Sequence, residues 1–470
     1  MRPEDLQDNY YFGGGATETA VTPLVVGLLV LACILLLFIK RKYMVLPFLG
    51  CGLLIPVSQV VVIFGFHLQA ARVLILFAWA RLFWSAFLSK QDPFPEMNAV
   101  DKVFASWAVC NAILYTILWH AVGAFTNRLG FLYSTLGIYF LLRYVVRDRD
   151  DVIRAIKVLA VVALPIALLM IAEHRTGSNP ISFLTGAAQF PEVRNGSIRA
   201  QGPFAHSIIA GTFGAMLLPL FVGLWWQGKG NRLVAALGIL CSFVIAAMSS
   251  SSTPIMTLGA GLLGLFFWPF RKSMRVVRWG LVVSLIGLQL VMQAPVWFLL
   301  ARLGFLLGGT GWHRAELIDQ FVRHFSEWWL IGTQNNASWG LDMWDSINVY
   351  VNAGVEGGLI TFIMFIALIV YAFKRIGAAR VSAEGDLQNE HLAWAIGVAL
   401  FSNTIAFLGI AYFDQSAIAW YALLVMISTA VPVAMVTEET QIKFGLARSA
   451  APQTTELERP WAKPRTAQPS

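Results

Sequence analysis

Two arginines, Arg199 and Arg314, stand beside glycine turns at the start of predicted helices, a setting that favours the binding of phosphate. A guanidinium group can hold phosphate oxygens through two parallel hydrogen bonds, and unpaired N–H groups at a helix start add to the attraction. The candidate residues near Arg199 are Gly202 and His206, and those near Arg314 are Gly309, Gly311, Trp312 and His313. The pattern predicts an anion-binding site, with solvation or pairing to a nearby acid as the alternative for each arginine.

The composition indicates that these residues lie in an integral membrane protein. Hydrophobic residues make up 57% of the 470 positions and charged residues 13%, and the mean hydropathy is +0.67. Apolar runs close to the roughly 20 residues that cross a bilayer recur along the chain. Inside lipid each run must satisfy its own backbone hydrogen bonds, and these runs are too long for barrel strands. We therefore expect an all-α, polytopic membrane helix bundle.

The apolar runs predict about thirteen membrane spans. They lie near residues 23–39, 43–58, 68–88, 102–122, 129–146, 152–172, 204–226, 232–248, 253–270, 276–293, 352–373, 392–411 and 416–436. The second run is the weakest, because it is short and contains Pro47 and Pro56. Residues 1–436 would form the membrane domain, and residues 437–470, with their Pro, Thr, Gln and mixed charges, a flexible cytoplasmic tail.

Basic residues recur at every second connection, for example at 40–42, 143–157, 271–278 and 374–380. Because cytoplasmic connections carry an excess of Lys and Arg, we expect the N-terminus outside and the C-terminus in the cytoplasm. Acidic residues outnumber Arg2 before the first span, unlike the start of a cleaved signal peptide, so this span is expected to remain. The net charge of +8 is then explained by membrane orientation and anionic lipid rather than by nucleic acid.

Two predicted outer segments, 173–203 and 294–351, are longer than a connection requires, which is typical of functional loops. The second contains six of the 17 tryptophans and a pattern that predicts one amphipathic helix at the outer surface. Its apolar face would be Leu317, Ile318, Phe321, Val322, Phe325, Trp328 and Trp329, opposite Glu316, Asp319, Gln320, Arg323 and Glu327. Such a helix could lie at the membrane interface, roof an active site, or do both.

No sequence motif indicates a cofactor or a metal. The chain contains no Walker loop, HExxH, GxSxG or dinucleotide fingerprint in a suitable context. The four cysteines stand singly inside apolar runs and are expected to fill the core. By default, Asp342, Asp345 and Asn348 would cap the next helix or shape the turn before it.

Taken in order, several motifs resemble those of the O-antigen ligase and polymerase superfamily of membrane glycosyltransferases. They are Arg199-x-x-Gly202-Pro203-Phe204-x-His206, Ser249–Thr253 between spans, Gly309-Thr310-Gly311-x-x-Arg314, and Asn348-x-Tyr350 followed by Gly354–Gly358. The resemblance implies a helical fold with a large periplasmic loop in the bacterial inner membrane. It also implies action on glycans linked to undecaprenyl diphosphate, without a nucleotide sugar or a metal.

On this resemblance Arg199 and Arg314 would engage the lipid diphosphate. For the general base that accepts the proton of the acceptor hydroxyl, Asp345 is the first candidate, with His206 and His313 behind it. Substrate contacts would come from Gly202, Gly309, Gly311, Trp312, Asn348 and Tyr350. Ile347 stands where the ligases characteristically have a histidine, so a polymerase or another polysaccharide-handling relative fits better than a ligase.

The expected partners are the undecaprenyl-diphosphate-linked glycan, membrane lipids and other polysaccharide assembly proteins, and no nucleic acid. Two other classes stay open. A transporter or flippase of an anionic lipid or solute would place charges at mid-membrane depth, whereas Arg72 and Arg81 lie toward the ends of their span. A noncatalytic component of an envelope assembly machine would tolerate loss of Arg199 and Arg314.

Overall fold

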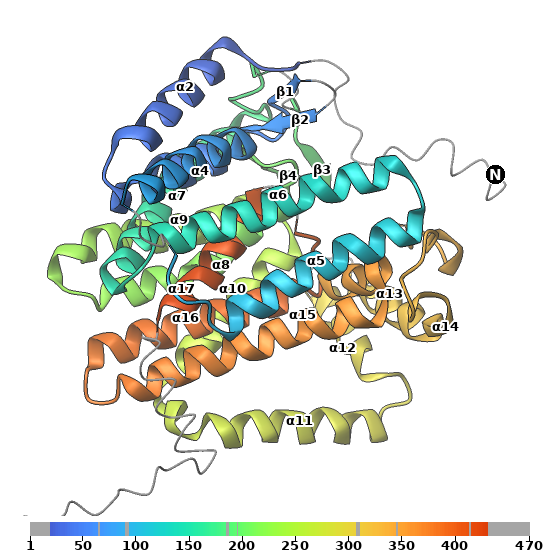
Figure 1. Ribbon diagram of the computed structural model, residues 1–470. Helices are drawn as coiled ribbons and strands as arrows, with labels where there is room; N and C mark the ends of the chain where they lie inside the picture. Colours follow the sequence, from blue (N-terminus) through green and yellow to red (C-terminus); the bar gives the residue numbers. More distant parts are fainter. Residues whose placement is uncertain are drawn as a thin grey trace, which may run out of the picture. The chain divides into compact units, whose positions relative to one another are not determined.

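The computed structural model describes residues 19–63, 66–89, 94–184, 188–194, 196–306, 311–344, 346–412 and 415–430. These residues belong to one compact unit, which is predominantly helical (Figure 1). The described residues are mostly helical, and several of the helices are long and apolar enough to cross a membrane, which is consistent with the expected all-α membrane bundle. The predicted tail at 437–470 lies outside the described residues.

The helices, in chain order, are α2 (Pro23–Phe38), α3 (Val45–Leu54), α4 (Ala70–Ser89), α5 (Ala99–Trp119), α6 (Val122–Val145), α7 (Arg149–Thr176), α8 (Ser207–Trp225), α9 (Arg232–Met248), α10 (Ser252–Phe266), α11 (Met274–Val291), α12 (Leu299–Leu306), α13 (Gly311–Arg323), α14 (Phe325–Trp328), α15 (Val349–Ser382), α16 (Leu387–Ala406) and α17 (Gln415–Thr429). Short 3-10 helices are η1 (Arg41–Tyr43), η2 (Lys229–Asn231), η3 (Trp268–Ser273), η4 (Val296–Phe298) and η5 (Ala337–Trp339). Two antiparallel hairpins accompany them in the described residues: β1 (Val60–Ile63) with β2 (Phe66–Gln69), and β3 (Glu192–Arg194) with β4 (Ser197–Arg199).

Each predicted apolar run coincides with a helix. Among the described residues, seven helices are long and apolar enough to cross a membrane, namely α4, α5, α7, α8, α9, α11 and α15. The helices α2, α10 and α17 are apolar but shorter. The run at 43–58 gives only the 10 residues of α3, which rise roughly 15 Å and so cover half of a ~30 Å hydrocarbon core. This helix ends at Leu54 because the residue before Pro56 disfavours the helical conformation.

The helix α8 lies at the centre of the bundle and supports the site. It packs against α7, α9, α10 and α16, and 89% of the residues in its most apolar stretch are buried. Its residues are apolar on all sides, as expected for a helix enclosed by other helices. By contrast, no residue in the apolar stretch of α11 is buried, and this helix lies apart from the bundle in Figure 1. The fixed position of α8 holds the neighbouring ends of α9 and α10 in place.

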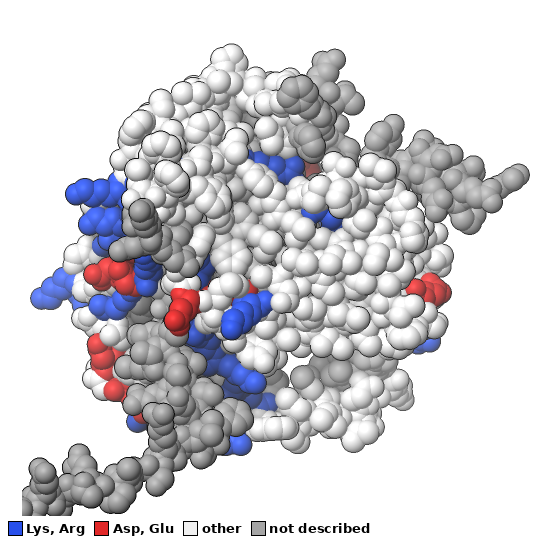
Figure 2. Space-filling model, viewed as in Figure 1, with Lys and Arg blue, Asp and Glu red and all other residues white. Residues whose placement is uncertain are grey.

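The connections that carry most of the basic residues contact one another. Arg41 pairs with Asp151 at 3.0 Å, which joins the connections at 40–42 and 143–157. Glu390 pairs with Arg271 at 2.8 Å and with Arg380 at 3.2 Å, which joins the connections at 271–278 and 374–380. Figure 2 shows Lys and Arg side chains gathered on one side of the molecule. Connections predicted to share one side of the membrane are therefore tied together in pairs.

The predicted amphipathic helix is interrupted, and its continuous apolar face was a wrong expectation. The helix α13 ends at Arg323, and the chain turns at His324 before α14. Trp328 folds back so that its ring stacks on Phe321 at 3.9 Å and its Nε1 donates to the Phe321 carbonyl at 2.7 Å. Leu317, Phe321 and Trp328 are buried, Ile318 is half-buried, and Val322, Phe325 and Trp329 are exposed. The turn thus concentrates burial on the side of α13 that faces α15.

A kink in α15 admits the segment that follows α14. The backbone leaves the helical conformation at Gly357 and Gly358, and Leu359 donates its N–H to the Trp329 carbonyl at 2.9 Å. Gly358 has φ of +72°, and a Cβ at this position would stand 2.6 Å from the Leu330 carbonyl oxygen. Only glycine combines this left-handed backbone with so close an approach.

We predict that Gly358→Ala destabilises the protein by ~2 kcal/mol or more, because the added Cβ brings both backbone strain and a clash. The measurement is the midpoint of thermal unfolding of the purified protein in detergent. Gly377→Ala is the matched control on the same helix, since a Cβ there has nothing within 4 Å. An unchanged midpoint for Gly358→Ala would contradict the proposed packing of the segment against the kink.

Candidate anion-binding site

The site is built around the turn between α9 and α10. Ser250 has φ of +44°, Ser251 precedes the helix, and Ser252 is its first residue. Serine is favoured immediately before a helix, and Pro254 is tolerated in the first turn. The first N–H groups of a helix have no partner inside it, and the helix dipole is positive at this end. The turn therefore presents hydrogen-bond donors and partial positive charge at one place.

Arg199 reaches this turn from the end of β4. Its Nη2 donates to Ser251 Oγ at 2.7 Å, and its Nη1 donates to the carboxylate of Glu192. The strand is fixed to the same turn, because Ser250 Oγ donates to the Ile198 carbonyl at 3.1 Å. Only 3% of Arg199 is exposed, and its Nε is buried with no hydrogen-bond partner among the described residues. The guanidinium is thus held in position, and its Nε–H has no partner in the part of the chain that the structure describes.

Arg314 reaches the turn from α13. Its Nη2 donates to Ser252 Oγ at 3.2 Å, and 7% of the residue is exposed. The backbone of Gly409 lies so close that a Cβ there would be 2.9 Å from Arg314 Nε. Burial lowers the pKa of Arg314 to about 10, and the positive charge of Arg194 adds to this effect. In the described part of the chain, no carboxylate forms an ion pair with Arg314 to offset its burial.

The two predicted arginines therefore bind consecutive serines, Ser251 and Ser252, at the start of one helix. With Arg194 the group carries three positive charges. In the described part of the chain, Glu192 alone forms ion pairs with these arginines. An excess of positive charge beside a helix start, with Arg199 and Arg314 buried, is suited to binding a multivalent anion such as a diphosphate.

Glu192 forms an ion pair with Arg199. The two residues are opposite each other in the β3–β4 hairpin, so their side chains share one face. Burial raises the pKa of Glu192, but hydrogen bonding and the charges of Arg199 and Arg194 outweigh burial and lower it overall from 4.5. The ion pairs therefore stabilise the hairpin above the ordinary pKa of the carboxyl, and this contribution is lost as the pH falls through the lowered value.

The remaining predicted catalytic residues are two histidines and Asp345. His206 is exposed at the start of α8, and His313 is half-buried on α13 beside Arg314. Trp312 is 64% exposed, with its ring 5.3 Å from that of Phe298. Asp345 and Gly309 lie outside the described residues.

Several predicted substrate-binding residues use their polar groups within the protein. Asn348 caps α15, where its Oδ1 accepts from the N–H of Tyr350 at 2.9 Å, and the Tyr350 hydroxyl donates to the Thr404 carbonyl at 2.9 Å. Gly202 donates its N–H to Glu173 Oε2 at 2.7 Å, and Gly311 is buried at the start of α13. These contacts fix the start of α15 and the loop that follows Arg199.

The sequence did not single out Glu192, Arg194 or Gly409, and it gave Ser251 and Ser252 no individual role. One signal was available: Asn195-Gly196 is typical of a two-residue hairpin turn and would have placed Glu192 opposite Arg199. No comparable signal brings Gly409 to Arg314, because that contact joins segments far apart in the chain.

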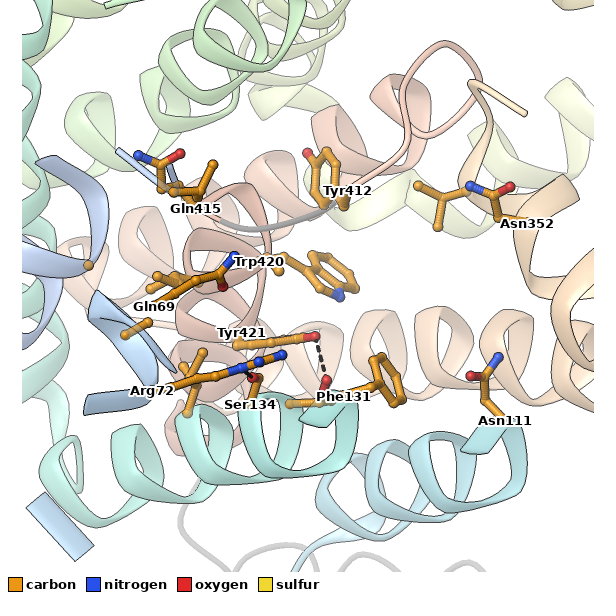
Figure 3. A pocket seen from close by; sticks show the side chains of 18 of the residues that line it. Gln69, Arg72, Asn111, Phe131, Ser134, Asn352, Tyr412, Gln415, Trp420 and Tyr421 are labelled. Atoms are coloured by element: carbon orange, nitrogen blue, oxygen red, sulfur yellow. Dashed lines mark hydrogen bonds between the residues drawn. The ribbon is translucent and has the colours of Figure 1, made fainter. Parts of the chain in front are cut away.

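A separate cavity of about 410 Å³ lies among α3, α4, α5, α6, α15 and α17 (Figure 3). Arg72 and Arg128 both line it. Arg72 donates to Ser134 Oγ at 3.0 Å, and Arg128 pairs with Glu356 at 3.1 Å. The sequence gave Arg72 little weight, whereas the structure places it in the wall of a cavity within the helix bundle.

No family model matches this chain, and no characterised protein matches it in sequence. The chemistry of the site therefore rests on its own geometry. Two guanidinium groups and two serine hydroxyls meet at the start of α10, and these are the kinds of group that bind phosphate oxygens.

We predict that Gly409→Ala weakens the binding of inorganic diphosphate by roughly tenfold, about 1.4 kcal/mol, without removing any charge. The new Cβ would stand 2.9 Å from Arg314 Nε and 3.0 Å from Thr253 Oγ1, so the buried guanidinium must shift. Isothermal titration of the purified protein measures the change. Gly259→Ala on α10 is the control, since its Cβ has nothing within 4 Å. Equal affinity in the two variants would argue against Arg314 as a phosphate ligand.

We further predict that Glu192→Gln lowers the unfolding midpoint of the free protein and enlarges the rise caused by diphosphate. The amide leaves Arg199 without its ionic partner, and the bound anion then supplies the missing charge. Thermal unfolding with and without millimolar diphosphate provides both values. Glu384→Gln, which alters an exposed pair with Arg380, serves as the control. A smaller rise in Glu192→Gln than in the wild type would count against competition between Glu192 and the anion.

Proposed function

We propose that this protein is a membrane glycosyltransferase of the O-antigen ligase and polymerase type, acting on glycan linked to undecaprenyl diphosphate in polysaccharide biosynthesis. The observation that supports this most is the convergence of Arg199 and Arg314 on Ser251 and Ser252. A lipid-linked glycan donor carries a diphosphate at the bond that breaks, and this group matches the charge and donors of the site.

The proposed reaction needs the arginines at the moment of transfer. An acceptor hydroxyl attacks the anomeric carbon, the bond from that carbon to the diphosphate oxygen breaks, and negative charge grows on the departing lipid diphosphate. Fixed guanidinium groups and the N–H groups at the start of α10 stabilise this charge without having to reorganise. The hydroxyl proton passes to a general base, for which Asp345, His206 and His313 remain the candidates.

The proposed location is the bacterial inner membrane, with about thirteen spans, the N-terminus outside and the C-terminus in the cytoplasm. The ion pairs among the basic connections support this orientation, because they gather residues typical of the cytoplasmic side. The arginine site is built from the connections 173–203 and 294–351 and the turn after α9, which alternate with the basic ones along the chain. Glycan transfer would then occur at the periplasmic face.

Within this class a polymerase is the better fit. Ile347 occupies the position of the ligase histidine, and it directly precedes Asn348, whose Oδ1 caps α15. An apolar side chain cannot accept the proton of an acceptor hydroxyl, so that role must pass to another residue.

A transporter of an anionic lipid or solute is the second candidate. It is favoured by the cavity within the helix bundle, where Arg72 and Arg128 line the wall. Charged residues inside a membrane domain often mark a substrate path. Accumulation of lipid-linked glycan on the cytoplasmic leaflet of a deletion strain would support this candidate, whereas accumulation on the periplasmic leaflet supports the transferase.

We predict that Arg199→Ala and Arg314→Ala each reduce glycan chain growth by ~100-fold or more, the usual effect of losing one donor to a developing charge. Each variant is expressed in a deletion strain, and glycan length and lipid-linked repeat units are measured. Lysine substitutions should restore only part of the activity, because lysine lacks the two-pronged hydrogen-bonding geometry.

Arg323→Ala provides the matched control for these variants. Arg323 lies on the same helix as Arg314, but 67% of its side chain is exposed and it pairs with Asp319. Normal glycan growth in Arg199→Ala and Arg314→Ala, at wild-type protein levels, would contradict the proposed activity.

A further inference from the structure

The cavity among the helices has a lining suited to hydroxyl-rich ligands. Figure 3 shows Asn111, Asn352 and Gln415 at its wall together with the aromatic side chains of Tyr412 and Trp420. Amide groups exchange hydrogen bonds with hydroxyls, and aromatic rings offer flat faces to the apolar faces of sugar rings. A volume of about 410 Å³ falls within the ~300–1,000 Å³ typical of small-molecule sites.

Two residues that line the cavity each carry a buried donor that lacks a partner in the described part of the chain. Trp107 Nε1 and Arg128 Nε are buried, and neither has a hydrogen-bond partner among the described residues. An unpaired buried donor costs about 1–3 kcal/mol, and a hydrogen bond from a ligand oxygen that reaches the donor removes this cost. A polyprenyl chain has no such oxygen, so the lining disfavours the lipid tail as the occupant.

The charged residues of the wall are held before any ligand arrives. Arg128 Nη1 donates to Asn111 Oδ1 at 2.9 Å and pairs with Glu356 at 3.1 Å. Its guanidinium lies 3.5 Å from the centre of the Tyr115 ring. Because these contacts fix the guanidinium plane, the direction of the unpaired Nε is fixed as well.

The cavity and the arginine site share one segment of the chain. Phe407, Tyr412 and Gln415 line the cavity, whereas Gly409 contacts Arg314 and accepts from Thr253 Oγ1 at 3.1 Å. Gln415 also donates to the Pro203 carbonyl at 3.0 Å, in the loop that follows Arg199. The segment 407–412 therefore joins the cavity wall to the surroundings of Arg314.

We propose that this cavity binds sugar residues of the glycan whose diphosphate is held by Arg199 and Arg314. This inference rests on the proposed function and adds a binding site to it. Trp107 Nε1 and Arg128 Nε donate to sugar hydroxyls, and the amide of Asn352 donates to or accepts from them. The segment at 407–412 sets the distance between the sugar and the departing diphosphate.

The test uses two conservative variants of the full-length protein. Trp107→Phe removes the Nε1 donor and keeps a ring, and Asn352→Leu removes the amide at similar size. The probe is the repeat-unit oligosaccharide released by mild acid from the lipid-linked intermediates of the deletion strain. Binding is followed by the intrinsic tryptophan fluorescence of purified protein. Trp279→Phe, on the exposed helix α11, is the matched control for Trp107→Phe.

We expect each cavity variant to bind the oligosaccharide at least tenfold more weakly, while undecaprenyl diphosphate binds within about twofold of wild type. Arg199→Ala should show the reverse pattern. Wild-type oligosaccharide binding in Trp107→Phe and Asn352→Leu overturns the cavity assignment and leaves the proposed function standing. If Arg199→Ala and Arg314→Ala leave glycan growth unimpaired, the proposed function itself has failed. Unfolding midpoints within a few degrees of wild type establish that both variants are folded.

Discussion

Two guanidinium groups of like charge are buried beside the positive end of one helix, and this arrangement works against folding. Moving a charge out of water costs several kcal/mol unless an opposite charge compensates it. Here Glu192 pairs with Arg199 and Arg194, and the pKa of Arg314 falls to about 10 because burial and Arg194 both disfavour its charged form. Residues that are unfavourable for stability persist where binding or catalysis needs them. The site is thus organised around a deficit of negative charge.

The surrounding fold supplies the rigidity that this arrangement requires. The central helix α8 fixes the turn between α9 and α10, and the hairpin that carries Arg199 is bonded to the same turn through Ser250. The helix that carries Arg314 is held from its other end, where Trp328 stacks on Phe321 against α15. Each arginine is therefore anchored through a different part of the bundle, and the serine hydroxyls are where the two supports meet.

The sequence was most informative about elements set by local pattern. The apolar runs located the helices because a helix in lipid needs a continuous apolar surface. The predicted amphipathic helix is not continuous because tertiary contacts interrupt it. The chain turns at His324, and Trp328 folds back onto Phe321, a contact that helical periodicity does not encode. The arginines could be chosen by their charge and their glycine turns, but their serine partners could not be. For Asn348 the residue type predicted a helix cap and the resemblance implied substrate contact; the cap is confirmed, since its Oδ1 accepts from the N–H of Tyr350.

Transfer between two lipid-borne glycans would require the charge-stabilising site and the sugar-binding site to be held at a constant separation. The segment from Phe407 to Tyr412 meets this need, because one side contacts Arg314 through Gly409 and the other lines the cavity. Its position is set from both directions: the Tyr412 hydroxyl donates to Asn403 Oδ1 at 2.8 Å, and the Phe407 carbonyl accepts from the first N–H of α15 at 3.0 Å. A shift of about 1 Å in reacting atoms can cost a hundredfold in rate. On the proposed function, the rigidity of this segment would therefore contribute to catalysis as directly as the charges that it adjoins.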